Sequence, residues 1–175
     1  KDYGDFIERY SPLVKRSGLF FFGSIDLARP EVIRHNRRLK ERYVPPDNAE
    51  TLILFPSFGP RRTLKLKRYK KILSDICSKL HVEKDSIHVC FYVPPFGVVP
   101  IEICDAYPLS QFEIARPLDA ETIRHVAQRI VEYVNRSSYK RRVMIIESGT
   151  WQEETAQICK ELFKKREEML EFLTV

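Results

Sequence analysis

The segment Thr51-Leu-Ile-Leu-Phe55 and the apolar runs that follow it at residues 86–93 and 142–146 decide the fold. All three are near-continuous and rich in branched residues, as is typical of strands whose two faces are both covered by helices. Helical periodicity fills the interval between the first two runs. This βαβ order predicts parallel pairing in an open sheet.

Two helices are predicted from the spacing of apolar residues. Over residues 64–80 they fall at i, i+3, i+4, i+7, i+8 and i+11, and the same spacing recurs over residues 119–135. Asp119 is a natural N-cap for the second helix. A short strand near residues 111–114 and a closing helix over residues 150–173 complete the expected α/β fold, an open, mostly parallel sheet with helices on both faces.

A helix-strand-helix lead-in is expected before this sheet. Residues 1–16 are predicted to be helical, residues 19–22 to form a buried strand, and Pro30 to begin a second helix. The apolar stripe of that helix is expected to consist of Val32, Ile33 and Leu39. We predict that a lead-in over residues 1–46 packs on an α/β module over residues 47–175 as one compact domain.

Composition and length are those of a globular chain. The 175 residues are 43% hydrophobic and 31% charged, which excludes a disordered or low-complexity protein. The longest apolar run, residues 18–23, is far shorter than the roughly 20 residues that a membrane helix requires, and the sequence begins without a signal-peptide pattern. We expect a cytoplasmic protein without a membrane partner.

The four cysteines and the four histidines show no pattern of a metal or catalytic site. No CxxC pair occurs, and the cysteines lie among apolar neighbours, which predicts core residues in a reducing compartment: Cys77, Cys90, Cys104 and Cys159. The sequence contains no GxSxG motif and no phosphate-binding glycine loop. We expect neither a metal site nor a complete active site in this chain.

The densest charge feature is a basic run over residues 61–71, in which seven of eleven residues are cationic and none is acidic. The formal net charge of the chain is +6. On a helical projection the cations point to solvent, and Arg61 and Arg62 are expected just before the helix, where its N-terminal dipole favours a phosphate. The run is predicted to contact an RNA backbone, or alternatively to be a solvated face without a partner. Its cations are Arg61, Arg62, Lys65, Lys67, Arg68, Lys70 and Lys71.

Two further basic clusters are less dense. The first is predicted to join the RNA contact through Arg34, Arg37 and Arg38, although Glu31 and Glu41 are interspersed. The second consists of Arg136, Lys140, Arg141 and Arg142. Tertiary structure decides which of the clusters share a face.

A proline-rich segment over residues 94–113 directly follows a predicted core strand. We interpret it as a rigid loop at the carboxyl ends of the strands, where ligands of such sheets approach. Other loops at these ends begin at Pro56 and Glu147. Alternatively, Glu102 and Asp105 cap the loop or face solvent. The residues expected to line a pocket are Ser57, Phe96, Gly97, Glu102, Tyr107 and Gln111.

Several stretches resemble the archaeosine tRNA-guanine transglycosylases. Residues 29–46 and 51–56 are similar to the region just after the catalytic barrel of that family. A more specific likeness lies in Pro95-Phe-Gly-Val-Val-Pro-Ile-Glu102, Tyr107-Pro-Leu-Ser-Gln-Phe-Glu113 and Pro117-Leu-Asp119, which are similar to the PFGVVPxE…YPLSQFE…PLD signature. Trp151 is a further candidate match.

The resemblance implies an α/β module of an archaeal protein of tRNA modification. Its implied partners are tRNA, a catalytic transglycosylase barrel that exchanges guanine in the D-arm for 7-cyano-7-deazaguanine, and a C-terminal RNA-binding domain. The family's zinc belongs to that barrel, whose ligands have no counterpart here, so no cofactor is expected. We predict a tRNA-binding accessory module, either a fragment or one piece of a split protein.

The related archaeosine synthases give the main alternative. They share the module but place a Pro-Cys-Ser-containing motif with a lysine and a histidine after its first strand. Here that stretch reads Phe55-Pro-Ser-Phe-Gly-Pro-Arg-Arg62, without the cysteine or the histidine. A synthase-type reaction at Ser57 is therefore the less favoured hypothesis. A third hypothesis, a scaffold that only joins neighbouring domains, predicts no affinity for RNA.

Overall fold

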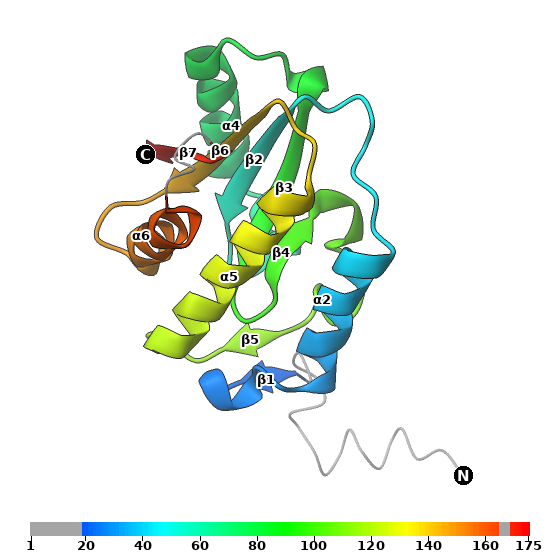
Figure 1. The fold of residues 1–175 in the computed structure, drawn as a ribbon, viewed down its shortest axis with the longest axis vertical. Coiled ribbons are helices and arrows are strands. Elements are labelled where there is room, and N and C mark those ends of the chain that lie inside the picture. The colour runs from blue at the N-terminus through cyan, green and yellow to red at the C-terminus, as the bar shows by residue number, and fades with distance from the viewer. Residues whose placement is uncertain (1–18, 165–168) are drawn as a thin grey trace.

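A computed structural model describes residues 19–164 and 169–175, so the helix predicted over residues 1–16 lies outside the described residues. Five strands form the central sheet in the order β4-β3-β2-β6-β7 (Figure 1). Among them only β4 runs antiparallel, which confirms the open, mostly parallel sheet. The bounds are Thr51–Pro56 for β2, Ile87–Val93 for β3, Gly97–Pro100 for β4, Arg141–Ile146 for β6 and Glu171–Thr174 for β7.

Helices cover both faces of the sheet, as expected. One face packs against α4 (Lys67–Leu80), and the opposite face packs against α5 (Ala120–Arg136) and α6 (Trp151–Phe163). Figure 1 shows α5 crossing in front of the sheet. Because side chains alternate along a strand, the buried residues of β2 divide between the layers. Ile53 and Phe55 face α4, whereas Leu52 and Leu54 face α5 and α6.

The helix α2 (Pro30–Glu41) begins with proline at its first turn, as predicted. Val32 and Leu39 are buried, but Ile33 is 44% exposed, so its place in the apolar stripe was predicted wrongly. His35 occupies the inner face instead, and its Nε2–H donates to the carbonyl of Val98 in β4 at 2.7 Å. Burial lowers the pKa of His35 to about 4, so the ring is neutral at pH 7.

The helix predicted over residues 64–80 is α4, and a second helix that was not predicted precedes it. A short α3 (Pro60–Leu64) begins after Gly59, and α4 begins at Lys67 after an extended Leu66. Proline at the first position favours a helix start at residue 60. Arg61 and Arg62 precede α4 as predicted, but they lie inside α3 and so are not at the N-terminus of α4.

The proline-rich segment contains a strand that the sequence did not reveal. Residues 93–100 are all buried, and β4 pairs with β3 from Gly97↔Val93 to Pro100↔Cys90. Proline is compatible with β4 because β4 is an edge strand. Gly97 has a φ of +96°, and a Cβ there would lie 2.5 Å from Arg129 Cβ, so this position requires glycine.

The C-terminal helix is shorter than predicted. It ends at Phe163, where Lys164 adopts a φ of 53°, and residues 171–174 form β7 beside β6 rather than continuing the helix. The guanidinium of Arg141 donates to both carboxylate oxygens of Glu171, at 2.6 and 2.9 Å, and so ties the two strands together.

A second, two-stranded parallel sheet joins β1 (Phe20–Phe21) to β5 (Glu113–Ile114). Both strands were predicted, although Phe20 and Phe22 are exposed and Leu19 and Phe21 are buried. Leu19 and Phe21 belong to the same core cluster as residues of β2, β3 and α4. No helix in the described part of the chain is long and apolar enough to cross a membrane.

Candidate nucleic-acid interface

All seven cations of the basic run predicted from the sequence are exposed. Its members, termed here the α3–α4 cations, are Arg61, Arg62, Lys65, Lys67, Arg68, Lys70 and Lys71. Among the described residues, one of them forms an ion pair, in which Arg61 Nε lies 3.7 Å from Asp105 Oδ1 at the surface. Exposed pairs of this kind contribute little. The surface therefore keeps nearly all of its positive charge.

The basic cluster on α2 lies apart from the α3–α4 cations. Arg34, Arg37 and Arg38 are exposed on α2, which bonds to β4 through His35 and to α5 through Arg136. The helix α4 instead covers the opposite face of the sheet, and Figure 1 shows α2 and α4 well apart. The structure therefore does not join the two clusters into one continuous helical surface.

In the basic cluster of Arg136, Lys140, Arg141 and Arg142, most of the cations contact other protein groups. Lys140 Nζ lies 2.8 Å from Glu50 Oε1, and Arg141 bonds to Glu171 and to the carbonyl of Leu80. Arg136 Nη1 donates to the carbonyl of Leu39 at 3.4 Å. Arg136 and Arg141 already donate to protein acceptors, which makes them weaker candidates for contacting RNA, whereas the Lys140 pair is exposed and contributes little.

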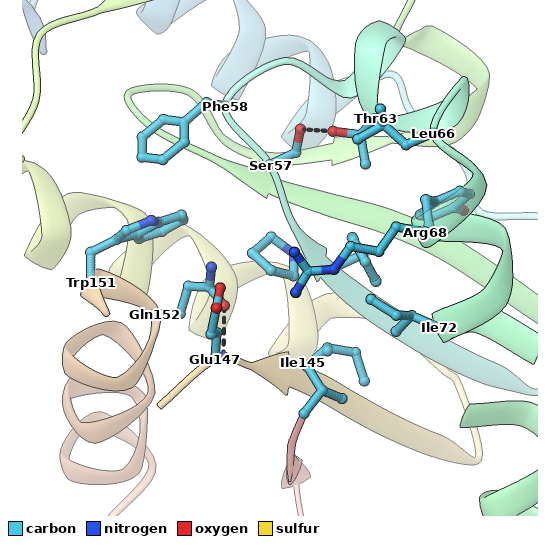
Figure 2. Close-up of a pocket in the computed structure, with 14 residues that line it drawn as sticks. Ser57, Phe58, Thr63, Leu66, Arg68, Ile72, Ile145, Glu147, Trp151 and Gln152 are labelled. Atoms are coloured by element: carbon cyan, nitrogen blue, oxygen red, sulfur yellow. Dashed lines mark hydrogen bonds between the residues drawn. The ribbon is translucent and has the colours of Figure 1, made fainter. Parts of the chain in front are cut away.

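A cavity of about 240 Å³ opens at the carboxyl ends of β2 and β6 (Figure 2). This is the end at which a parallel sheet commonly presents a ligand site. Figure 2 shows Arg68 reaching from α4 into the cavity, with Glu147 and Gln152 across from it. The aromatic and polar lining of this strand-end cavity comes mainly from Ser57, Phe58, Arg68, Glu147, Trp151 and Gln152.

Ser57 shapes the turn that leads into the cavity. Its hydroxyl accepts the N–H of Gly59 at 2.9 Å and lies 2.6 Å from Thr63 Oγ1. Thr63 Oγ1 in turn donates to the carbonyl of Gly59 at 3.1 Å, so Ser57 is the donor within the hydroxyl pair. These bonds tie β2 to α3 and fix the direction in which Phe58 and the α3–α4 cations project.

An aromatic wall forms one side of the strand-end cavity. The rings of Phe58 and Trp151 have centroids 5.3 Å apart, and Trp151 also packs edge-on against Tyr92 at 5.4 Å. The guanidinium carbon of Arg116 lies 4.6 Å from the centroid of the Phe58 ring. Cations attract the faces of aromatic rings, so Arg116 holds positive charge at this wall.

Glu102, predicted for the same pocket, lies at the other end of the sheet. Its Oε1 is 2.7 Å from Nε2 of His88, the second residue of β3, and its Oε2 accepts the hydroxyl of Tyr43 at 3.0 Å. Nδ1 of His88 lies 2.6 Å from the hydroxyl of Tyr139. Burial lowers the pKa of His88, although Glu102 opposes that shift. Glu102 therefore anchors the segment that follows β4.

The remaining predicted pocket residues also lie away from the cavity. Phe96 is fully buried against Phe21 and Phe112, Gly97 packs on Arg129, and Tyr107 and Gln111 are exposed. Of the six residues proposed for the pocket, Ser57 lines the strand-end cavity. The structure thus does not bring the six together. Phe58 and Arg116 were missed because no local pattern indicates that their segments meet.

The cysteines and acidic residues form no group suited to a metal ion in the described part of the chain. All four cysteines are free thiols inside the core. Burial raises the pKa of Cys159 to about 12, which keeps its thiol protonated and unreactive at neutral pH.

A sequence family described as a domain of unknown function (DUF5591) matches residues 32–174. The chain belongs to the DUF5591 family. Among curated proteins, this DUF5591 chain is 32% identical over 145 residues to the tRNA-guanine(15) transglycosylase of Saccharolobus solfataricus, which covers 82% of the chain and 27% of the relative. No solved structure gives a significant match.

Archaeosine synthases are also among the relatives of the DUF5591 chain. It is 35% identical over 108 residues to archaeosine synthase subunit alpha of Thermococcus kodakarensis, covering 58% of the chain and 18% of the relative. The match to archaeosine synthase subunit alpha of Methanosarcina acetivorans is 29% identical and covers 93% of the chain and 25% of the relative. The resemblance inferred from the PFGVVPxE signature is confirmed. The chain spans about a quarter or less of the length of these relatives.

Proposed function

We propose that the chain is a tRNA-binding accessory module of an archaeosine transglycosylase protein, and that its α3–α4 cations hold the RNA phosphate backbone. The observation that carries the proposal is the exposure of seven cations within eleven residues, with a single surface ion pair among the described residues. A surface made only for solubility intersperses both signs of charge. The relatives named for modification of tRNA make RNA the polyanion that this surface fits.

Backbone contact suits this surface better than reading of bases. Tyr69 is the aromatic residue within the run, and it is buried against Phe55 and Phe91 rather than presented to a ligand. Cations without exposed aromatic neighbours neutralise phosphates but offer no platform for stacking. The α3–α4 cations should therefore bind different RNA sequences with similar affinity.

A salt titration tests the proposal. Each phosphate contact adds about 0.7–0.9 to the slope of log affinity against log salt concentration. Lys67→Ala with Lys71→Ala should weaken tRNA binding and flatten this slope by roughly 1 to 2 units without changing the fold. The matched control is Lys40→Ala with Lys140→Ala, which removes the same charge from two lysines paired with Glu132 and Glu50.

The control pair should leave the slope nearly unchanged. An unchanged slope in the Lys67 and Lys71 variant would place the RNA surface elsewhere, and Arg34→Ala with Arg38→Ala would then test α2. No binding of tRNA by the unmodified chain would instead support the scaffold hypothesis. The synthase-type alternative has its own assay, in which tRNA carrying the nitrile base and an amino donor are incubated with the chain.

A further inference from the structure

We infer that the strand-end cavity receives one unpaired base of an RNA bound to the α3–α4 cations, with the base stacked on the wall formed by Phe58 and Trp151. The inference rests on the proposed function and deepens it, because it assigns base contact to a surface distinct from the backbone surface. Arg68 belongs to both surfaces, since it is one of the α3–α4 cations and also lines the cavity.

The size and lining of the cavity fit a single planar ring system. Its volume of about 240 Å³ is below the roughly 300–1,000 Å³ typical of sites for drug-sized ligands. Phe58 and Trp151 are each only half-buried, so both rings keep surface for a further partner. Every nucleobase has a flat π-face that stacks on such rings.

Charge around the aromatic wall favours a nucleotide over an uncharged aromatic ligand. Arg116 lies over the Phe58 ring. Figure 2 shows Arg68 extending into the cavity from the side that faces Phe58 and Trp151. Within the described residues neither arginine has an acidic partner within salt-bridge distance. A base stacked on Phe58 would therefore have two nearby cations, Arg68 in the cavity and Arg116 at the Phe58 ring, for its flanking phosphates.

Polar groups remain available to the edge of a stacked base. The side-chain oxygen of Gln152 accepts the N–H of Glu147 at 2.8 Å, which orients the amide and leaves its NH₂ group to donate. The Glu147 side chain is exposed and also lines the cavity. The cavity thus offers both a donor and an acceptor beside the aromatic wall.

The location of the strand-end cavity beside the α3–α4 cations also supports the binding of a base there. An RNA strand that follows the α3–α4 cations passes the mouth of the cavity, because α3 directly follows the turn that carries Ser57 and Phe58. Bases inside a duplex cannot reach such a wall, whereas bases in loops or bulges can leave the stack. The expected ligand is therefore RNA with an unstacked nucleotide.

The test compares three RNA hairpins that share one sequence. One is fully paired, one carries a single bulged nucleotide, and one carries an abasic bulge at the same place. Stacking of one base is worth about 1–3 kcal/mol, so the bulged base should raise affinity about 5-fold to 100-fold over the abasic bulge. Trp151 is the single tryptophan of the chain, so its fluorescence should change with the bulged base and not with the abasic bulge.

Variants separate stacking from folding and from backbone binding. Trp151→Ala should abolish the preference for the bulged base, and Trp151→Phe should retain part of it. The control Phe22→Ala, at an aromatic residue that is 73% exposed and follows β1, should preserve the preference. Lys67→Ala with Lys71→Ala should weaken all three hairpins alike. The inference is overturned by equal affinity for bulged and abasic hairpins, or by a preference that survives Trp151→Ala. Equal binding of all three leaves the proposed function intact, whereas no binding of any hairpin overturns both.

Discussion

The two ends of the parallel sheet use their polar side chains in opposite ways. At the amino ends, buried His88 contacts Glu102 through one ring nitrogen and Tyr139 through the other. At the carboxyl ends, Arg68 and Glu147 line one cavity, and in the described part of the chain neither has a salt bridge. Polar groups that satisfy one another hold a fold together, whereas exposed groups without partners are available to a ligand.

The amino-end network extends further into the core. The Tyr139 hydroxyl lies 2.8 Å from that of Tyr133, whose hydroxyl receives a weak bond from Cys90 at 3.6 Å. Burial raises the pKa of Tyr139, so its hydroxyl stays protonated at physiological pH. A site at the amino ends has few groups left for chemistry, which directs the search for function to the carboxyl ends.

The largest expected effect concerns the core that both ends share. Ile76 in α4 and Ile130 in α5 are buried on opposite faces of the sheet. Changing either to alanine removes apolar contacts and leaves a cavity, so the unfolding free energy should fall by about 2–5 kcal/mol. Urea unfolding measures this, with exposed Ile33→Ala as the control. Near-zero losses at both core positions would contradict the layered fold.

A second prediction concerns the pH dependence of stability. His35 joins α2 to the edge strand β4, so it tests the packing of this edge apart from the two ends of the strands. Its pKa is about 4 in the folded chain, below the roughly 6.5 of an unfolded histidine. Between these values the unfolded state binds more protons, so the contribution of His35 to stability is complete above pH 6.5 and falls by about 3 kcal/mol as the pH drops toward 4. His35→Gln should flatten the urea-unfolding profile in this window. An unchanged profile would mean that His35 is not buried as a neutral ring.

A third, smaller effect on stability distinguishes the amino ends of the sheet from the carboxyl ends. His88→Ala leaves the Glu102 and Tyr139 side chains without their shared partner, and the unfolding free energy should fall by about 1–3 kcal/mol. Glu147→Ala at the carboxyl ends should change stability by no more than about 0.5 kcal/mol, because its side chain is exposed. Equal losses in the two variants would remove the distinction between a structural and a functional end.

Strands and helices with strong local patterns were predictable from the sequence. The apolar runs of β2, β3 and β6 and the periodicity of α5 reappear with bounds shifted by a residue or two. The missed β4 carries glycine and proline, which indicate a loop unless an edge strand tolerates them. The missed β7 follows a break at Lys164, where the helix ends with a positive φ that no sequence pattern signalled.

The site was only half predictable, for a topological reason. The α3–α4 cations lie within eleven residues of sequence, so their shared exposure was predicted correctly. Because β4 turns back along β3, residues after Pro100 return toward the amino ends, and Glu102 meets His88 instead of Ser57. The aromatic wall joins segments nearly a hundred residues apart, from Phe58 to Trp151, and only the folded chain brings them together.

The smallest expected effect is a gain in stability, whereas the effects above are losses. Lys67 and Lys71 are one helical turn apart, and like charges at this spacing destabilise a helix by roughly 0.2–0.5 kcal/mol. Replacing both with alanine should therefore raise the unfolding free energy by about that amount, while tRNA binding weakens.

The matched pair on α2, Arg34 and Arg38, has the same spacing but acidic Glu31 and Glu41 in the neighbouring turns, so Arg34→Ala with Arg38→Ala should give no such gain. Urea unfolding at low and high salt distinguishes the two, because salt screens repulsion between exposed charges and should erase the gain of the lysine variant. A loss of stability in that variant at low salt would show that the two lysines have partners within the protein, and the carboxyl-end surface would then resemble the paired amino end.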